Sequence, residues 1–469
     1  MRERGLTTNV SEQAGLRAGA LGLVDCIGQS VASIGPTLTP AINIALVAGL
    51  AGNGSWLSFL VATVGMMFVA FNISTLSHRH TLSGSYFLYI GRTAGPLAGL
   101  VSGWLLIGAY LMMGVAISFG FLVFLQHFLD AVGLVSWQPD QMLTVAVLVA
   151  SMTLAAWGNV RFSARLGLAL EALSLIILAV VTTVVVMRSG RIVDTLQLDF
   201  GSLRLGGIMT SLTFAVFCFV GFESAATLAR ETRNPRRNVP LAVTVSTLLS
   251  GLFFVAIAYF MVLGFDDNAA AIADSASPLT EMARRAGLSA AAGVLYFGAL
   301  ISSCACLLAS LNAVSRLLFS MARYAVLPRR LAAVHPRHRT PYVGIALSAV
   351  MVLALSLALL PLGNLEAFGD AGALATFGFL AIYFLICIAA PLDQHAAGTL
   401  ALRHLLASGG GVLMMTFVIF GSVYPVPPWP QNLLPYLFAG YTLLGTVWCH
   451  LLLRRRPGLG KRLQLDLEG

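Results

Sequence analysis

Charged residues are scarce in this chain of 469 residues, because aspartate, glutamate, lysine and arginine together make up only 10% of it. Soluble globular proteins carry about 25% charged residues, so this sequence has too few charges to cover a solvent-exposed surface. Disorder is excluded as well, because 58% of the residues are hydrophobic and disordered chains are poor in such residues. The composition indicates a chain that lies mostly in a lipid bilayer.

The usual signatures of metal sites, disulfide frameworks and common catalytic sites are also missing. All six cysteines lie in apolar segments, and Cys304 and Cys306, two positions apart, point to different faces of a helix. The eight histidines do not show the spacing of metal ligands, and there is neither a Gly-x-Ser-x-Gly motif nor a phosphate-binding loop. We therefore expect no metal, no cofactor and no enzymatic activity.

Twelve stretches with almost no charge recur along the chain, at about the 20-residue length of a transmembrane helix. They are residues 18–50, 55–77, 96–129, 141–158, 166–187, 205–229, 239–265, 286–315, 341–360, 371–392, 405–424 and 433–453. The sequence therefore predicts an all-α integral membrane protein with twelve transmembrane helices. The loops are too short for a soluble core, so we expect one transmembrane domain over 18–453 between tails at 1–17 and 454–469.

The basic residues predict how this domain is oriented. Of the 28 lysines and arginines, 22 lie on the side that both termini share, five lie on the other side, and Arg316 lies near a helix end. Positive residues favour the cytoplasmic side, so both termini are predicted to be cytoplasmic in a multi-pass protein of the cell membrane. Orientation and anionic lipid headgroups then explain the net charge of +9 without a nucleic-acid partner.

The first span contains a stretch that disfavours an unbroken helix. Its middle, residues 33–40, reads SIGPTLTP. Pro36 and Pro40 lack an amide hydrogen and clash with the carbonyl four residues earlier, and Gly35 adds flexibility. Unpaired backbone at membrane depth persists only where it is buried in protein or lines a polar cavity, so the break predicts a binding site. A proline kink without a ligand is the alternative.

A second interruption is predicted in the sixth span, where residues 217–224 read FCFVGFES. The glycine of this stretch, Gly221, lies two residues before a carboxylate, Glu223. If spans one to five form one repeat and spans six to ten another, the two breaks occupy matching places. Matching broken helices are the best pointer from sequence to a binding site near the middle of the membrane.

Several stretches resemble the amino acid, polyamine and organocation (APC) transporters. The segment FCFVGFESA, followed by ETRNPRRNVP at 231–240, resembles the sixth helix and the next loop of that family. The segment SLNAVSR at 310–316, followed by MAR at 321–323, is similar to its eighth helix. The resemblance covers nearly the whole chain.

The resemblance implies a LeuT-like fold that works by alternating access. Two inverted five-helix repeats would cover 18–187 and 205–392, with two extra helices in 405–453. Helices one and six would be unwound at mid-membrane, where one would bind the carboxylate of a substrate and the other its ammonium group. The implied carboxylate residues are Ser33, Ile34, Gly35 and Thr37; the implied ammonium residues are Phe217, Cys218 and Gly221. Phe217 would gate the pocket, and Ile107, Tyr110 and Ser310 would line its walls.

Two departures from the family pattern leave the ligands of the site open. Pro36 removes one amide donor from the first break, and the Thr37 hydroxyl is a possible replacement. Proton-coupled relatives often carry a lysine in span five, in place of a sodium ion. Here Ser174 aligns with that lysine and Glu171 lies about one turn earlier, so a proton is favoured and sodium stays possible.

Charges inside the spans are candidates for function, because each costs about 2.5–3.5 kcal/mol on insertion scales. Three acids, Asp25, Glu171 and Glu223, stand against one base, Arg316. Glu223 follows the second break and could exchange a proton near neutral pH, or it could be a structural carboxylate. For Asp25 a place at the cytoplasmic interface is favoured, Glu171 is either a helix-packing carboxylate or a proton or amine site, and Arg316 is expected to be a cytoplasmic gate or a snorkelling residue.

We expect a secondary transporter that moves a small amino acid or a related amine, driven by protons or by exchange. The excess of buried acids favours a substrate with an ammonium group. A sensor that binds such a substrate without transport is the alternative. A membrane enzyme has little support, since the sequence shows no catalytic motif.

Overall fold

The computed structural model describes residues 15–80, 86–201, 203–275, 277–288, 291–424, 426, 429–456 and 458–459. Within these residues the regular structure is helical, apart from one isolated parallel bridge between Leu21 and Thr232. The predicted all-α class is confirmed. The predicted N-terminal tail lies largely outside the described residues, as do positions 457 and 460–469 of the C-terminal tail.

Each predicted span contains at least one helix. The helices are α2 (Leu23–Ile34), α3 (Leu38–Ala51), α4 (Ser55–Arg79), α5 (Tyr86–Ala94), α6 (Pro96–Ala131), α7 (Gln141–Trp157), α8 (Val160–Ser189), α9 (Leu205–Phe217), α10 (Pro235–Gly264), α11 (Ala269–Ala273), α12 (Pro278–Arg285), α13 (Ala291–Arg323), α14 (Tyr342–Leu359), α15 (Asn364–Ala396), α16 (Leu402–Gly421) and α17 (Leu434–Arg455). Of these, α5, α11 and α12 lie outside the predicted spans. Short 3-10 helices lie at η1 (Gly52–Gly54), η2 (Ser224–Glu231), η3 (Arg329–Ala332), η4 (Leu360–Leu362) and η5 (Gln431–Leu433).

Nine helical stretches within the described ranges are long and apolar enough to cross a membrane. One of them, Ile42–Arg79, joins most of α3 to α4 through η1. Three further apolar helices, α2, α7 and α9, have only 10–17 residues each. The chain is thus a multi-pass membrane protein, and twelve crossings remain a prediction.

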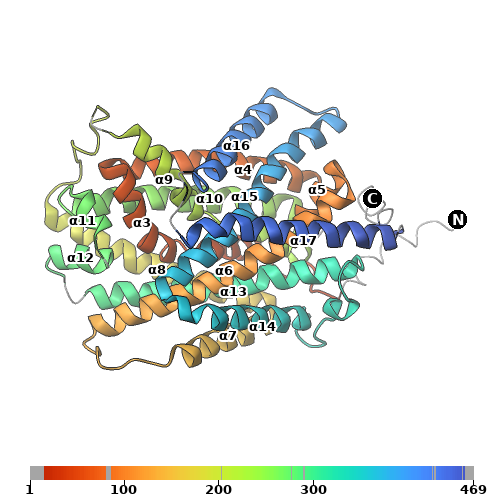
Figure 1. Cartoon of the computed structure of the whole chain (residues 1–469), viewed down its shortest axis with the longest axis horizontal. Helices are drawn as coiled ribbons and strands as arrows, with labels where there is room; N and C mark the ends of the chain where they lie inside the picture. The colour runs from red at the N-terminus through yellow and green to blue at the C-terminus, as the bar shows by residue number, and fades with distance from the viewer. Residues whose placement is uncertain are drawn as a thin grey trace.

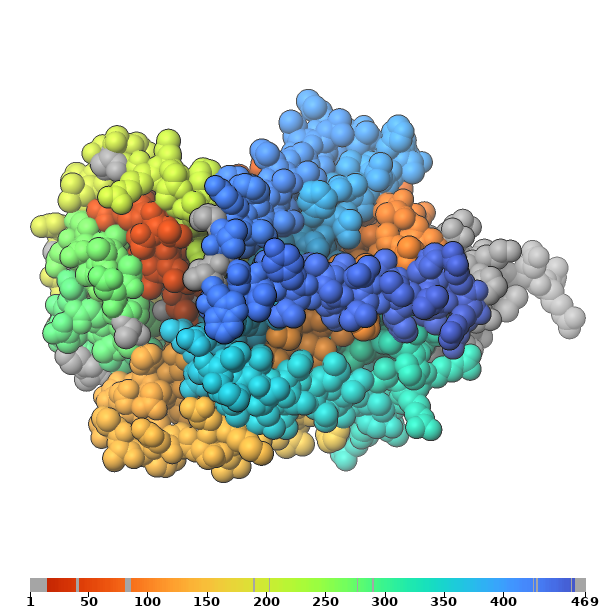
Figure 2. Space-filling model, viewed as in Figure 1, coloured from red at the N-terminus to blue at the C-terminus, as the bar shows by residue number. Residues whose placement is uncertain are grey.

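Most of the long helices run along the longest axis of the molecule, and α15 and α16 cross it obliquely (Figure 1). At the centre, α6 packs along α13 and α15, and α4 packs along α10. In both α6 and α13, 78% of the most apolar 18-residue stretch is buried. In the helical stretch that ends in α17, the corresponding share is 11%. Figure 2 shows α17 lying on the outer surface across one face of the bundle. The centre of the bundle is therefore formed by α6 and α13, beside the broken first helix.

The first predicted span is interrupted between α2 and α3. Gly35 has a φ of 58° and ends α2, Pro36 and Thr37 form a turn, and α3 begins at Leu38. The irregular stretch therefore ends before Pro40, which belongs to the first turn of α3. A proline is tolerated there because the first amides of a helix have no intrahelical acceptor.

Candidate binding site at the two helix breaks

The two helix breaks touch each other inside the bundle. Gly221 follows the end of α9 with a φ of 92°, and an added Cβ would lie only 2.5 Å from the Ser33 Oγ. Only glycine fits, because its backbone conformation and this contact both exclude a side chain. The Ser33 Oγ is buried and has no hydrogen-bond partner among the described residues. Since buried polar groups are normally paired, this hydroxyl is suited to bind a ligand.

The backbone of the first break is held by short-range bonds and by α13. The Gly35 amide donates to the Val31 carbonyl at 3.2 Å, and the Leu38 amide donates to the Gly35 carbonyl at 3.1 Å. The Cys306 thiol of α13 donates to the Ser33 carbonyl at 3.2 Å. Sequence reasoning missed Cys306. The available signal was its position four residues before Ser310, which places both on one face of a helix.

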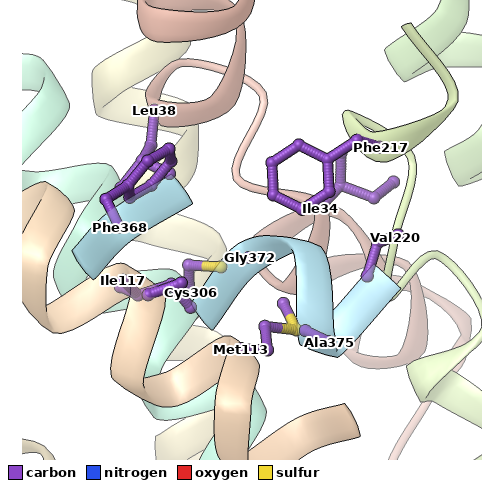
Figure 3. A pocket seen from close by; sticks show the side chains of 11 residues that line it. Ile34, Leu38, Met113, Ile117, Phe217, Val220, Cys306, Phe368, Gly372 and Ala375 are labelled. Atoms are coloured by element: carbon purple, nitrogen blue, oxygen red, sulfur yellow. The ribbon is translucent and has the colours of Figure 1, made fainter. Parts of the chain in front are cut away.

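A cavity of about 30 Å³ lies beside the breaks (Figure 3). Helix α6 lines it with Met113, Ala116 and Ile117, and α15 contributes Gly372 and Ala375. These helices form an apolar wall, because none of the five side chains carries oxygen or nitrogen.

The remaining lining residues come from the two breaks, from α13 and from a phenylalanine of α15. Ile34 and Phe217 lie on one side of the cavity, and Leu38 and Phe368 lie on the other (Figure 3). Val220 and Cys306 complete the lining. Phe217 packs tightly on α15, where an added Cβ at Gly372 would lie 2.8 Å from the end of the ring. Phe217 therefore closes one side of the cavity.

Several predicted pocket residues lie elsewhere. Ile107 is buried but does not line the cavity, since the α6 wall lies further along that helix. The Ser310 hydroxyl donates to the Tyr110 carbonyl at 2.7 Å and so joins α13 to α6. The Cys218 thiol donates to the Phe214 carbonyl and receives a bond from Asn43. The resemblance implied Ile107, Tyr110 and Ser310 on α6 and α13, but the cavity meets other residues of these two helices.

Glu223 is the centre of a buried group of tyrosines. Tyr110 of α6 donates to Oε1 at 2.7 Å, and Tyr383 of α15 donates to Oε2 at 2.5 Å. Tyr86 of α5 donates to the Glu223 carbonyl at 2.8 Å. Tyr383 also accepts the Gly221 amide at 3.3 Å. Glu223 thus joins the second break to three helices, two through its carboxyl group and one through its backbone carbonyl, and a change in protonation would alter the two bonds to the carboxyl group.

A second buried carboxyl group, Glu171 of α8, is joined to the first break. It accepts hydrogen bonds from Ser302 of α13 at 2.8 Å and from Thr37 at 3.5 Å. Ser174 donates to the Thr37 hydroxyl at 2.6 Å. The Thr37 side chain therefore faces the coupling candidates of span five. No group of three or more histidine, cysteine or acidic residues in the described chain is arranged to hold a metal ion.

The other buried charges lie where α2 begins. Asp25, in the first turn of α2, pairs with Arg165 of α8 at 3.2 Å. Arg316 forms an ion pair with Glu231 at 2.5 Å, and both side chains are almost fully buried. The Leu21 amide donates to the Glu231 carbonyl at 2.9 Å, and the Arg233 amide donates to the Leu21 carbonyl at 2.8 Å. These contacts join the chain just before α2 to η2 and α13. Sequence reasoning left Glu231 in a loop motif and did not pair it with Arg316.

A multi-pass helical protein with two broken helices meeting at a buried cavity has the design of a membrane transporter. The family model described as "Amino acid permease" matches residues 24–424. The chain therefore belongs to the amino acid permease family of the APC superfamily, as its motifs predicted.

Curated relatives of the chain are permeases and transporters. It is 26% identical to the branched-chain amino acid permease BcaP of Bacillus subtilis, over 72% of this chain and 74% of the relative. It is 32% identical to an uncharacterized transporter of Mycobacterium tuberculosis, over 72% of this chain and 73% of the relative. It is 28% identical to the low-affinity putrescine importer PlaP of Escherichia coli, over 77% of this chain and 79% of the relative.

Proposed function

We propose that this protein is a secondary transporter that carries a small amino acid or a related amine across the cell membrane by alternating access. The observation that carries the proposal is the contact between the two breaks, where the Ser33 hydroxyl is buried without a partner. The names of BcaP and PlaP, which describe an amino acid permease and an amine importer, support the same substrate range.

The helix ends favour binding of a zwitterion in one orientation. Helix α3 begins at Leu38, and the positive end of its dipole favours a carboxylate beside Gly35. Helix α9 ends at Phe217, and the negative end of its dipole favours an ammonium group beside Cys218 and Gly221. In this proposal, Ser33, Ile34 and Gly35 hold the carboxylate, and backbone carbonyls at 217–221 hold the ammonium group.

Alternating access requires one closure on each side of this site. The proposed fold has inverted repeats at 18–187 and 205–392, extra helices at 405–453 and both termini in the cytoplasm. Phe217 against Gly372 then closes the extracellular side. Arg316 with Glu231 closes the cytoplasmic side. Opening one closure at a time would expose the site to one solution at a time.

Glu171 and Glu223 are the proposed coupling groups, because each connects directly to a break. Protonation of Glu171 would change its bonds to Thr37 and Ser302, and protonation of Glu223 would change its bonds to the two tyrosines. Near Glu171, Ser174 donates a hydrogen bond to the Thr37 hydroxyl. Asp25 is a weaker candidate for coupling, because it is already paired with Arg165. A proton is favoured over sodium, since both sites are carboxyl groups that hydroxyl donors can stabilise in either protonation state.

The test is transport by purified protein in liposomes, with labelled amino acids and amines offered under a proton gradient, a sodium gradient or with substrate inside. We expect accumulation with the proton gradient or exchange with internal substrate. Glu171→Gln or Glu223→Gln should change the pH dependence of transport, with Asp130→Asn, a change at the end of α6, as the control. Binding without uptake or exchange would favour the sensor. Accumulation driven by sodium alone would reject proton coupling.

A further inference from the structure

The walls of the cavity are apolar, whereas the two helix breaks beside it offer polar groups. Each of the side chains that line it is apolar or sulfur-containing, so polar groups reach the cavity only through the backbone and the neighbouring Ser33 hydroxyl. A substrate held at the breaks by its carboxylate and ammonium groups would direct its side chain toward Met113, Ile117 and Ala375. An uncharged, apolar side chain suits these walls, because a polar one would lose its hydrogen bonds to water.

The buried carboxyl groups near the site do not line the cavity. Glu223 and Glu171 are each bonded to two hydroxyl groups and neither lines the cavity. Asp370 lies between Phe368 and Gly372 in sequence, but two residues from either, on another face of α15. A second positive charge, as in a diamine or a basic amino acid, would therefore be buried in the apolar walls without a counter-charge, which is strongly unfavourable.

The cavity is also narrow. Its volume is about 30 Å³, and the Phe217 ring already occupies the space that a side chain at Gly372 would fill. A large aromatic side chain would displace both phenylalanine rings that bound the cavity, Phe217 and Phe368. Small aliphatic side chains fit with smaller movements.

From these walls we infer that the substrate is an amino acid with a small, uncharged, aliphatic side chain, and that diamines and basic amino acids are rejected. This inference rests on the proposed function, because it assumes that the breaks bind the carboxylate and ammonium groups. It selects one part of the substrate range that the proposed function leaves open.

Binding to the full-length protein in lipid nanodiscs tests the inference without requiring transport. Labelled L-valine is the probe, and unlabelled alanine, leucine, phenylalanine, arginine and putrescine are the competitors. We expect alanine and leucine to compete, and arginine and putrescine to bind at least about tenfold more weakly, since an unpaired buried charge is costly. Arginine or putrescine binding as tightly as valine would overturn the inference and leave the proposed function standing. If labelled valine does not bind, the inference fails, and the liposome assay with its wider panel decides the proposed function.

A matched pair of variants tests whether the apolar wall of the cavity determines the selectivity. Met113→Glu introduces a carboxylate into the lining, and Met113→Gln has nearly the same shape without the charge. We expect the ratio of arginine to valine affinity to rise at least about tenfold in the Glu variant relative to the Gln variant, because a counter-charge is now present. An unchanged ratio in two folded variants would mean that the substrate side chain lies elsewhere. If either variant fails to fold, the wild-type competition decides alone.

Discussion

Phe217 is the residue that is proposed to close the extracellular side of the cavity. Its ring lines the cavity and rests against Gly372. In Phe217→Ala, the closure loses its ring while the backbone of the break is kept. We expect bound substrate to dissociate at least about tenfold faster. The loss of thermal stability should be small, because the Phe217 side chain is only partly buried and contributes less to the core than a fully buried one.

Phe214→Ala, on the same helix one turn earlier and outside the cavity lining, is the matched control. Dissociation of labelled substrate from nanodiscs measures both variants. Equal acceleration in the two variants would mean that the helix as a whole, and not the ring of Phe217, retains the substrate.

Asp267, in the turn after α10 and outside the spans, should make the stability of the protein depend on pH. Burial, together with a hydrogen bond to the carboxylate of Asp194, raises the pKa of Asp267 to about 7. The folded protein therefore binds this proton more tightly than the unfolded chain. Its stabilising effect is present in full below the unfolded pKa of about 4, and it is lost as the pH rises through 7. Asp267→Asn should remove that loss.

We expect Asp267→Asn to melt a few degrees higher than the wild type at pH 8 and to differ little at pH 5. Apparent melting temperatures of the purified protein measure this. Asp274→Asn, an exposed position nearby, controls for the loss of one negative charge. A gain of the same size at both pH values would show that the proton shared with Asp194 is not its cause.

Residue types at the breaks could be predicted from sequence, because glycine and proline act on their own backbone. The cavity walls could not. The family resemblance implied Ile107, Tyr110 and Ser310 as pocket walls, whereas the cavity is lined by Met113, Ile117 and Cys306 of the same two helices. Both sets lie in the same apolar spans, so hydropathy does not distinguish them. The rotation of each helix decides, and it is set by partners distant in sequence.

At the scale of elements, the second break depends on one close approach. In Gly221→Ala, the new Cβ would meet the Ser33 Oγ, and the φ of 92° would be strained. We expect a loss of stability of about 1–3 kcal/mol from backbone strain and a loss of substrate binding beyond it. Thermal unfolding and valine binding, measured on the same preparation, separate the two effects.

Gly398→Ala is the control for strain, since Gly398 also has a positive φ, of 67°, but an added Cβ would meet nothing within 4 Å. It should lose some stability and keep its binding. Normal binding by Gly221→Ala would show that the breaks do not need to touch.

The position of each break was predictable to within a few residues, but its extent was not. The two prolines suggested a gap that reached Pro40, and the structure limits it to Gly35, Pro36 and Thr37. The reason is that Pro40 falls in the first turn of α3, where its missing amide has no consequence. The second break is followed by the 3-10 helix η2, a distinction that composition does not encode.

At the scale of the whole molecule, the buried ion pair of Arg316 and Glu231 is the proposed closure on the cytoplasmic side. Removing one partner leaves the other charge buried, which typically costs about 3–5 kcal/mol. We expect Arg316→Gln or Glu231→Gln to shift the protein toward a form open to the cytoplasm. Cys26 is a suitable reporter, because it is buried beside Thr232.

Maleimide labelling of Cys26 from the cytoplasmic side, in a background without the other five cysteines, measures this opening. Each single variant should label faster than the parent. The double variant should label more slowly than either, since it leaves no charge unpaired. Identical rates in all four proteins would mean that the ion pair does not control this end.

The class and family of the molecule were predictable because hydropathy and motifs are local properties of the chain. The pairings that organise it are not local. Glu231 and Arg316 lie 85 positions apart, and Glu171 and Ser302 lie 131 apart. Each of these residues was visible in the sequence, but only folding shows which one it meets.

The bridge that joins Leu21 to the chain around Thr232 has a consequence for how the protein can evolve. Its two hydrogen bonds are made by backbone amides and carbonyls, so changes of side chain at these positions leave the bonding groups in place. Substitutions along this seam should therefore leave the bridge in place. Side-chain contacts such as Asp25 with Arg165 lack this tolerance, because replacing either residue removes a bonding group.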